Sequence, residues 1–250
     1  NVLIGSSAGA AMTTGDYNIA IGYAAADGVT DGDNNIAIGK NALGTGTADS
    51  DACVAIGNNA LLVQNHTSCK NLAIGEDAGR AVSSGTHNVL IGHQAGSTLA
   101  SNGGMTAVGY NAMKLATGVN NTALGTHSGQ KIVAGASNTS IGANALYNAG
   151  DDSDGTETNN TAIGAAALYS LDADDAEGNT AVGYTAARYY NAGSGNAELV
   201  HAINSTYIGH LTRAHAGTTA TFPENENVIG YNALGIGDNT FALGDTNITA

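Results

Sequence analysis

A short pattern of polar and apolar positions recurs along the whole chain. A polar residue is followed by a β-branched residue or leucine, a small residue and a large aliphatic residue, and then by glycine, as in "NIAIG" at 18–22 and "NTAIG" at 160–164. Because side chains alternate between the two faces of a strand, the residues three and one before the glycine share one face, and the residue between them lies on the other. Each copy therefore predicts a short strand that breaks at glycine.

The strand-ending glycine occurs fourteen times, so the chain is a repeat protein. The unit is about 17 residues long as far as Gly142, and most of the later units carry insertions. We expect residues 1–142 to form a regular repeat shaft and residues 143–250 to continue the same solenoid with inserted loops. The glycines are Gly5, Gly22, Gly39, Gly57, Gly75, Gly92, Gly109, Gly125, Gly142, Gly164, Gly183, Gly209, Gly230 and Gly244.

The predicted fold class is all-β, a parallel β-solenoid or β-roll of about 14 short coils. One short strand cannot bury its face alone, but successive copies stacked at the spacing of a sheet build a continuous parallel sheet. The abundance of glycine and the lack of a 3.6-residue period oppose helices. Asparagine stands four residues before the glycine in nine copies, where its amide can bond to the backbone and to the same position of the next coil.

Four columns of the repeat are expected to hold each coil together: the asparagine, the aliphatic residue before the glycine, the glycine, and an alanine three residues after it. In three representative copies these residues are Asn18, Ile21, Gly22, Ala25, Asn35, Ile38, Gly39, Ala42, Asn160, Ile163, Gly164 and Ala167.

The two strand faces lead to a prediction about assembly. We expect the isoleucine column to fill the core of its own coil, which leaves the alanine two residues before each glycine on the opposite face. Alanine is unusual at a solvent-facing strand position, and parallel sheets buried on both faces read as nearly continuous apolar runs. Another copy of the chain would cover this side, which predicts a homotrimer. The alternative is a single-chain solenoid in which the alanines line a narrow second core.

The repeat motifs resemble those of known fibrous proteins. "NIAIGYAA" at 18–25, "NNTAIGAAAL" at 159–168 and "NTAVGYTAA" at 179–187 are similar to the head repeats of trimeric autotransporter adhesins, and more closely to those of bacteriophage tail fibres and related surface adhesins. The resemblance covers essentially the whole chain and implies a homotrimeric fibre of β-solenoid chains. "NTFALGDTNITA" at 239–250 is similar to the segment that precedes an intramolecular chaperone domain in many such fibres. We therefore expect the chain to be a piece of a longer fibre.

Composition limits the possible partners and chemistry. The formal net charge is −14 and the chain has only seven lysines and arginines, which argues against a nucleic-acid partner. No apolar run is long enough to span a membrane, so membrane insertion is not expected. The histidines and cysteines lack zinc-site spacing, and no serine lies in a nucleophile-elbow motif. We expect a protein that is not an enzyme and needs no cofactor.

Clusters of acidic residues are the one metal-site hypothesis with geometric content, and further clusters stand at 151–157 and 172–179. Asp31 and Asp33 hold the same places before their glycine as Asp49 and Asp51 hold before the next. On adjacent coils these carboxylates would repel, so either solvent and splayed loops relieve the repulsion or a Ca²⁺ ion bridges them. Elsewhere, Cys53 and Cys69 lie one coil apart and two places out of register, which leaves open a disulfide or two buried thiols.

The insertions are the expected place for receptor binding, because extra residues must leave the coil as loops. The candidates are Asp151, Asp152, Asp154, Tyr189 and Tyr190. The tyrosines could stack on a sugar ring, or they could cover a coil end or a trimer seam. The predicted function is a non-catalytic structural and adhesive fibre segment that attaches to a glycan or protein receptor on a host or partner cell. Its expected location is extracellular, on a virion tail fibre or a bacterial surface.

Two other functions stay open. An ice-binding solenoid presents a flat threonine array, and threonine stands three residues before the glycine at positions 106, 122, 139, 161, 180 and 206. We expect these threonines to face inward, because they share a face with the isoleucines. A polysaccharide-degrading solenoid enzyme would need carboxylates gathered in a groove, and the insertions could supply them.

Overall fold

In a computed structural model, the chain folds as a parallel β-solenoid. The structure describes residues 1–45, 50–66, 68–148, 157–171, 176–191, 196–199, 201–215 and 223–244, and these contain no helix. The chain divides into two compact units, residues Asn1–Asn120 and Asn121–Ala250. Asp49, Asp151, Asp152 and Asp154 lie outside the described residues.

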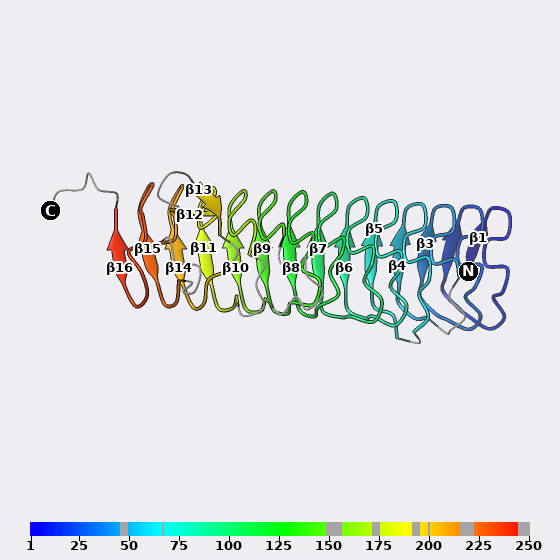
Figure 1. Cartoon of the computed structure of the whole chain (residues 1–250). Coiled ribbons are helices and arrows are strands. Elements are labelled where there is room, and N and C mark those ends of the chain that lie inside the picture. Colours follow the sequence, from blue (N-terminus) through cyan, green and yellow to red (C-terminus); the bar gives the residue numbers. More distant parts are fainter. Residues whose placement is uncertain are drawn as a thin grey trace. The chain divides into compact units, whose positions relative to one another are not determined.

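Each unit contains seven described strands of a parallel sheet, and every strand has three residues and ends just before a repeat glycine (Figure 1). Neighbouring strands pair in register, as in Ile19↔Ile36 and Thr161↔Thr180. Those of the first unit are β1 (Val2–Ile4), β2 (Ile19–Ile21), β3 (Ile36–Ile38), β4 (Val54–Ile56), β5 (Leu72–Ile74), β6 (Val89–Ile91) and β7 (Thr106–Val108). Those of the second are β8 (Thr122–Leu124), β9 (Thr139–Ile141), β10 (Thr161–Ile163), β11 (Thr180–Val182), β14 (Thr206–Ile208), β15 (Asn227–Ile229) and β16 (Phe241–Leu243).

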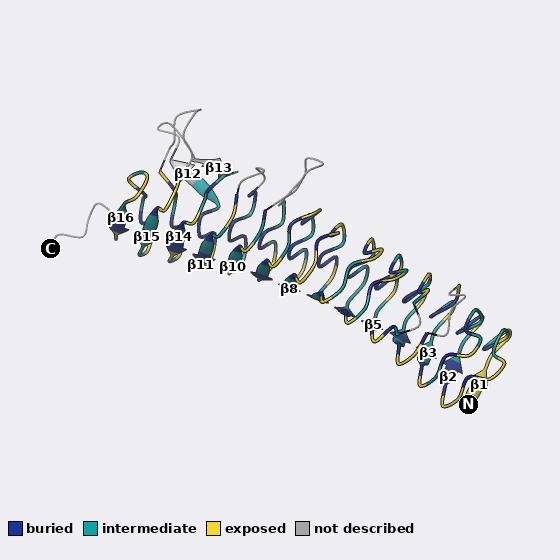
Figure 2. Ribbon diagram, turned by 90° about the horizontal axis from the view of Figure 1, so that it is seen from below, coloured by how far each residue is buried: buried dark blue, intermediate teal, exposed yellow. Residues whose placement is uncertain are grey.

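The two strand faces are used in the opposite way to the prediction. The middle residue of each strand from β2 to β11 is buried inside its own coil, while the two residues beside it are half-buried or exposed on the outer face (Figure 2). Ala37 is completely buried, for example, whereas Ile38 is not. The expectation that the isoleucine column fills the coil's own core is therefore wrong. Small residues predominate at this middle strand position, although Leu90 and Tyr207 are also fully buried there.

Two columns of the repeat fill the core in a complementary way: the middle strand residue, and the residue four places after the glycine. Where the middle strand residue is alanine, as at Ala37, leucine can stand four residues after the glycine, as at Leu43, and both are completely or almost completely buried. Where the middle residue is Leu90, that second position is Gly96, and a Cβ there would lie 2.7 Å from the Leu90 Cδ2. Interiors are close-packed, and in the coils of β2 to β11 no more than one of these two positions carries a large side chain.

Nine asparagines, all buried except Asn1, each join their coil to the next. The Nδ2 group donates to a backbone carbonyl of the following coil at 2.5–3.1 Å, and Oδ1 accepts from the backbone N–H at the corresponding position there at 2.8–3.0 Å. This confirms that the asparagine amides bond to the backbone of the next coil. The asparagines are Asn1, Asn18, Asn35, Asn71, Asn88, Asn121, Asn138, Asn160 and Asn179.

Glycine ends each strand because the next coil passes too close for a side chain. Gly39 has a φ of +130°, and a Cβ there would lie 2.6 Å from the carbonyl oxygen of Gly57. The turn then continues with a left-handed residue two places later, for example Asn41 and Asn59. Asparagine tolerates this conformation better than most residues, which accounts for its recurrence there.

A disulfide stands at one of the positions where the asparagine ladder is interrupted. Cys53 occupies the ladder position of its coil and is bonded to the buried Cys69 of the next, with Cα atoms 5.5 Å apart. The bond joins the same two coils that an asparagine at position 53 would join. The sequence left a disulfide and two free thiols open, and the structure has the disulfide.

Removing one ladder asparagine should destabilise the fold strongly. In Asn88→Ala, the buried N–H of Met105 and the carbonyl of Asn102 lose their partner, which should cost about 2–4 kcal/mol of unfolding free energy. Urea unfolding followed by circular dichroism measures the loss. Asn58→Ala is the matched control, since Asn58 is exposed and makes one 3.4 Å bond, and it should change stability by less than about 0.5 kcal/mol. Equal losses would contradict the role of the ladder.

The disulfide should be replaceable by a ladder asparagine. Breaking it in the double variant Cys53→Ser/Cys69→Ser should cost about 3 kcal/mol, the value for a closed loop of similar length. The double variant Cys53→Asn/Cys69→Ser should recover part of this loss, because an asparagine amide at position 53 can bond to the backbone of the next coil. Thermal unfolding of both variants and of reduced wild type makes the comparison. Identical unfolding midpoints for the two variants would contradict the prediction that an asparagine at position 53 can replace the disulfide.

Candidate functional site

The outer sheet face carries no charged residue on the described strands of either unit; it is almost entirely aliphatic in the first unit and combines threonine with aliphatic residues in the second. The two outward positions of the described strands of the parallel sheet carry Ile, Val, Leu, Thr, Phe or Asn, and none carries a charged residue. Several aliphatic side chains are exposed there, including Leu124 (48%), Ile163 (38%) and Ile208 (39%). In a chain of net charge −14, such a face is a candidate for contact with another surface.

Threonines form a regular row on this face in the second unit. Thr122, Thr139, Thr161, Thr180 and Thr206 are directly paired across neighbouring parallel strands. All five are half-buried on the outer face beside the aliphatic row. The expectation that these threonines face inward is therefore wrong. They share a strand face with the isoleucines, and that face is the outer one.

An aromatic row borders the sheet face, one residue after the glycine. In the first unit, the rings of His93 and Tyr110 stack with centroids 5.3 Å apart. In the second, His210 contacts Tyr184 and Tyr231 edge-on at 5.1 and 5.3 Å. Tyr184 and Tyr231 are more than half exposed, so the row widens the surface that the sheet face offers to a partner.

One insertion of the second unit forms an antiparallel hairpin of strands β12 (Tyr189–Asn191) and β13 (Asn196–Glu198). It lies at the opposite edge of the coils from the parallel sheet (Figure 2). The Glu198 carboxylate accepts from the Arg188 guanidinium at 3.2 Å and from the Ser170 hydroxyl at 2.6 Å. These bonds fix the base of the hairpin to the coil beneath it.

A stack of aromatic and cationic groups supports the same hairpin. The rings of Tyr147 and Tyr169 stack at 5.1 Å, and the Arg188 guanidinium lies 4.3 Å from the Tyr169 ring centre and 5.0 Å from that of Tyr189. Burial, followed by the nearby Tyr147, raises the pKa of the Tyr169 hydroxyl, and Arg188 opposes this. Tyr189 therefore packs against Arg188 at the base of the insertion. For Tyr190 only the backbone is described, which pairs with Ala197.

The carboxylates proposed for calcium accept hydrogen bonds from the preceding coil. Asp33 accepts from the backbone N–H of Asp16 at 2.6 Å, and Asp51 accepts from that of Asp33 at 2.8 Å. The Thr13 and Thr14 hydroxyls donate to Asp31 and lower its pKa. Within the described ranges, which leave out Asp49, no three acidic, histidine or cysteine side chains gather as a metal site. A calcium ion at these positions stays a prediction.

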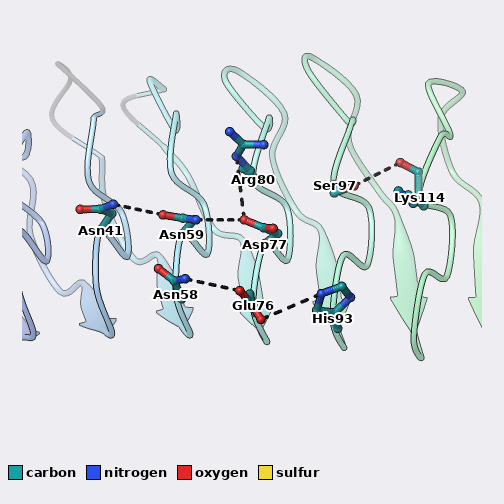
Figure 3. A network of polar contacts seen from close by, with 9 residues as sticks. All are labelled: Asn41, Asn58, Asn59, Glu76, Asp77, Arg80, His93, Ser97 and Lys114. Atoms are coloured by element: carbon teal, nitrogen blue, oxygen red, sulfur yellow. Dashed lines mark hydrogen bonds and ion pairs between the residues drawn. The ribbon is translucent and has the colours of Figure 1, made fainter.

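A polar network follows the edge of the first unit just beyond the strands (Figure 3). Asn41 donates to Asn59 and Asn59 donates to Asp77, both at 3.1 Å, and Asp77 lies 3.9 Å from Arg80. These residues come from three successive coils. The network was not predicted from the sequence, although Asn41, Asn59 and Asp77 stand two residues after consecutive repeat glycines.

A shallow groove of about 410 Å³ lies beside this network. Leu62, Val63 and Ala81 form its apolar part, and Arg80, Gln94, Ser97, Thr98 and Lys114 form most of its polar part. Arg80, Ser97 and Lys114 each stand five residues after the glycine of three successive coils, so the signal was present in the sequence as one column.

No family model, curated protein or solved structure matches this chain. In the part of the chain that the structure describes, no helix is long and apolar enough to cross a membrane.

The ion pair of Arg188 should hold the hairpin in place. In Arg188→Gln, the amide of Leu199, which donates to the Arg188 carbonyl at 2.9 Å, should exchange with deuterium about fivefold faster. The overall melting temperature should change little, because the pair is partly exposed. Glu177→Gln, an exposed carboxylate of a neighbouring coil, is the control. Unchanged exchange at Leu199 in Arg188→Gln would show that the ion pair does not anchor the hairpin.

Proposed function

We propose that this chain is a non-catalytic structural and adhesive segment of an extracellular fibre, in which three copies cover one another's outer sheet faces. The observation that carries the proposal is the uncharged and largely aliphatic sheet face. Removing apolar surface from water is worth about 25 cal/mol per Å², so a face of many Ile, Val and Leu side chains favours burial. The partner is a further copy of this chain, because the outer-face residues of two copies repeat at the same coil-to-coil spacing.

The homotrimer proposed here differs from the sequence-based one in its contact surface. The alanines are inside the coil, so the isoleucine, valine, leucine and threonine columns would meet around the axis. The number of copies rests on the resemblance of the repeats to trimeric fibre proteins. The aromatic row with Tyr184 and Tyr231 would then lie at the seam between copies.

The adhesive part of the proposal rests on what such packing leaves uncovered. The β12–β13 hairpin stands at the opposite edge of the coils from the sheet, so it stays accessible when the sheet face is buried (Figure 2). The Cys53–Cys69 disulfide suits an oxidising extracellular setting. The fibre would attach to a glycan or protein receptor on a host or partner cell surface.

A second candidate function is ice binding. The specific observation is the in-register row of Thr122, Thr139, Thr161, Thr180 and Thr206 on the outer face, beside an aliphatic row. Such a flat array would have to face water, so this function and the covered sheet face exclude each other in the second unit. The mass in solution therefore distinguishes the two candidates.

A charge on the sheet face should break the assembly. Light scattering should give wild-type protein three times the chain mass of 24.7 kDa. Ile38→Glu should give a folded monomer, because three buried carboxylates would meet at the axis. Ser84→Glu, which places the same charge on an exposed position away from the sheet, should remain trimeric.

A monomeric wild type would overturn the trimer. If that monomer showed thermal hysteresis, and Thr161→Glu abolished it, the ice-binding function would replace the fibre.

A further inference from the structure

The groove of the first unit concentrates positive charge in an acidic protein. The chain has seven lysines and arginines against 21 acidic residues, yet two of the seven, Arg80 and Lys114, line this one groove. The only acidic side chain among its lining residues is Asp77. The groove therefore favours a negatively charged ligand, although the molecule as a whole is negatively charged.

The contacts of Asp77 leave most of this positive charge available. Asp77 accepts from Asn59 at 3.1 Å and lies 3.9 Å from the Arg80 Nε, and the Arg80 side chain is 58% exposed (Figure 3). An exposed pair at this distance is weak, so it orients the guanidinium without neutralising it fully. The ammonium group of Lys114 forms no ion pair with a described residue.

The spacing of the two cations selects the length of the ligand. Arg80 and Lys114 stand in one column, two coils apart, with Ser97 between them. Two sheet spacings are about 10 Å. This is close to the length of an extended disaccharide, so a chain with one carboxylate on every second sugar would place a carboxylate at each cation.

The remaining lining residues suit sugar rings. Gln94 offers an amide between the cations. The Ser97 and Thr98 hydroxyls donate to the Lys114 carbonyl at 3.5 and 2.7 Å, so they offer their oxygens as acceptors. Leu62, Val63 and Ala81 offer a short apolar strip, of which Val63 is 36% exposed. Saccharides combine hydroxyl groups with apolar ring faces, and binding sites combine apolar walls with a few placed polar groups.

We propose that this groove binds a linear acidic polysaccharide that carries one carboxylate on every second sugar. The inference rests on the proposed attachment function, whose receptor class it names. Arg80 and Lys114 each bind a carboxylate, Gln94 and Ser97 bind hydroxyl groups between them, and Asp77 positions Arg80. The glycan runs along the column, across three coils.

Calorimetry with a hexasaccharide of alternating glucuronate and N-acetylglucosamine tests the proposal. Wild-type protein should bind this probe, and raising the salt from low to high concentration should weaken binding. Arg80→Gln and Lys114→Gln should each raise the Kd about tenfold, since each removes a charged hydrogen-bonding partner. Lys40→Gln, which removes an exposed lysine of the same unit outside the groove, should leave the Kd unchanged.

Three results would overturn the proposal. These are equal binding of a neutral N-acetylglucosamine hexamer, no effect of the double variant Arg80→Gln/Lys114→Gln, or an equal loss in Lys40→Gln. Tighter binding of a polyglutamate peptide than of the acidic hexasaccharide would assign the groove to an acidic protein segment instead. Circular dichroism and melting temperature confirm that each variant is folded.

Retention of labelled protein on cell surfaces separates this inference from the proposed function. If wild type and the double variant are retained equally, attachment stands and the groove is not the receptor site. If the hexasaccharide binds in the groove but wild type is not retained on any cell surface that displays such glycans, the groove stands and the attachment function fails.

Discussion

The asparagine ladder is the interaction on which the other features depend. Each buried amide satisfies one N–H and one carbonyl of the following coil, so the ladder fixes both the distance and the register between coils. A buried backbone group without a partner costs about 1–3 kcal/mol, and the apolar side chains of the core, such as Ala37 and Leu43, offer no replacement. Once the register is fixed, residues at equal places in successive repeats form columns, and the surface of the regular coils outside the insertions is a set of such columns.

The sequence predicted the coils but not which strand face is inside. A period of two places Ile36 and Ile38 on one face and Ala37 on the other, and the burial pattern of this strand confirms the alternation. Both columns are apolar, however, so the pattern alone does not say which one faces the core. The turn after the glycine decides, because it brings the residue four places after the glycine back against the middle strand residue, as Gly96 lies against Leu90. That return depends on left-handed residues such as Asn41, which the alternation of the strand does not report.

The candidate sites were predictable where they interrupt the repeat and unpredictable where they follow it. The insertion after Gly183 was visible as extra residues, and Tyr189 does lie at the base of a hairpin. The groove at Arg80 and Lys114 lies within regular repeats, 34 residues apart in the sequence. Only the coil spacing brings them to one edge, and the contacts of Asp77 and Asn59 depend on side-chain directions that the sequence does not give.

The same ladder also explains why surface chemistry on this fold favours extended partners. Because successive coils repeat at the spacing of a sheet, a favourable residue in one column is naturally followed by others along the same line. A compact ligand can use one or two such positions, whereas a chain-like ligand or another solenoid can use many. The uncharged sheet face is suited to a second solenoid with the same repeat, and the Arg80–Ser97–Lys114 column to a polymer with repeating charge. Separate columns of one coil can therefore serve assembly and attachment without competing for the same residues.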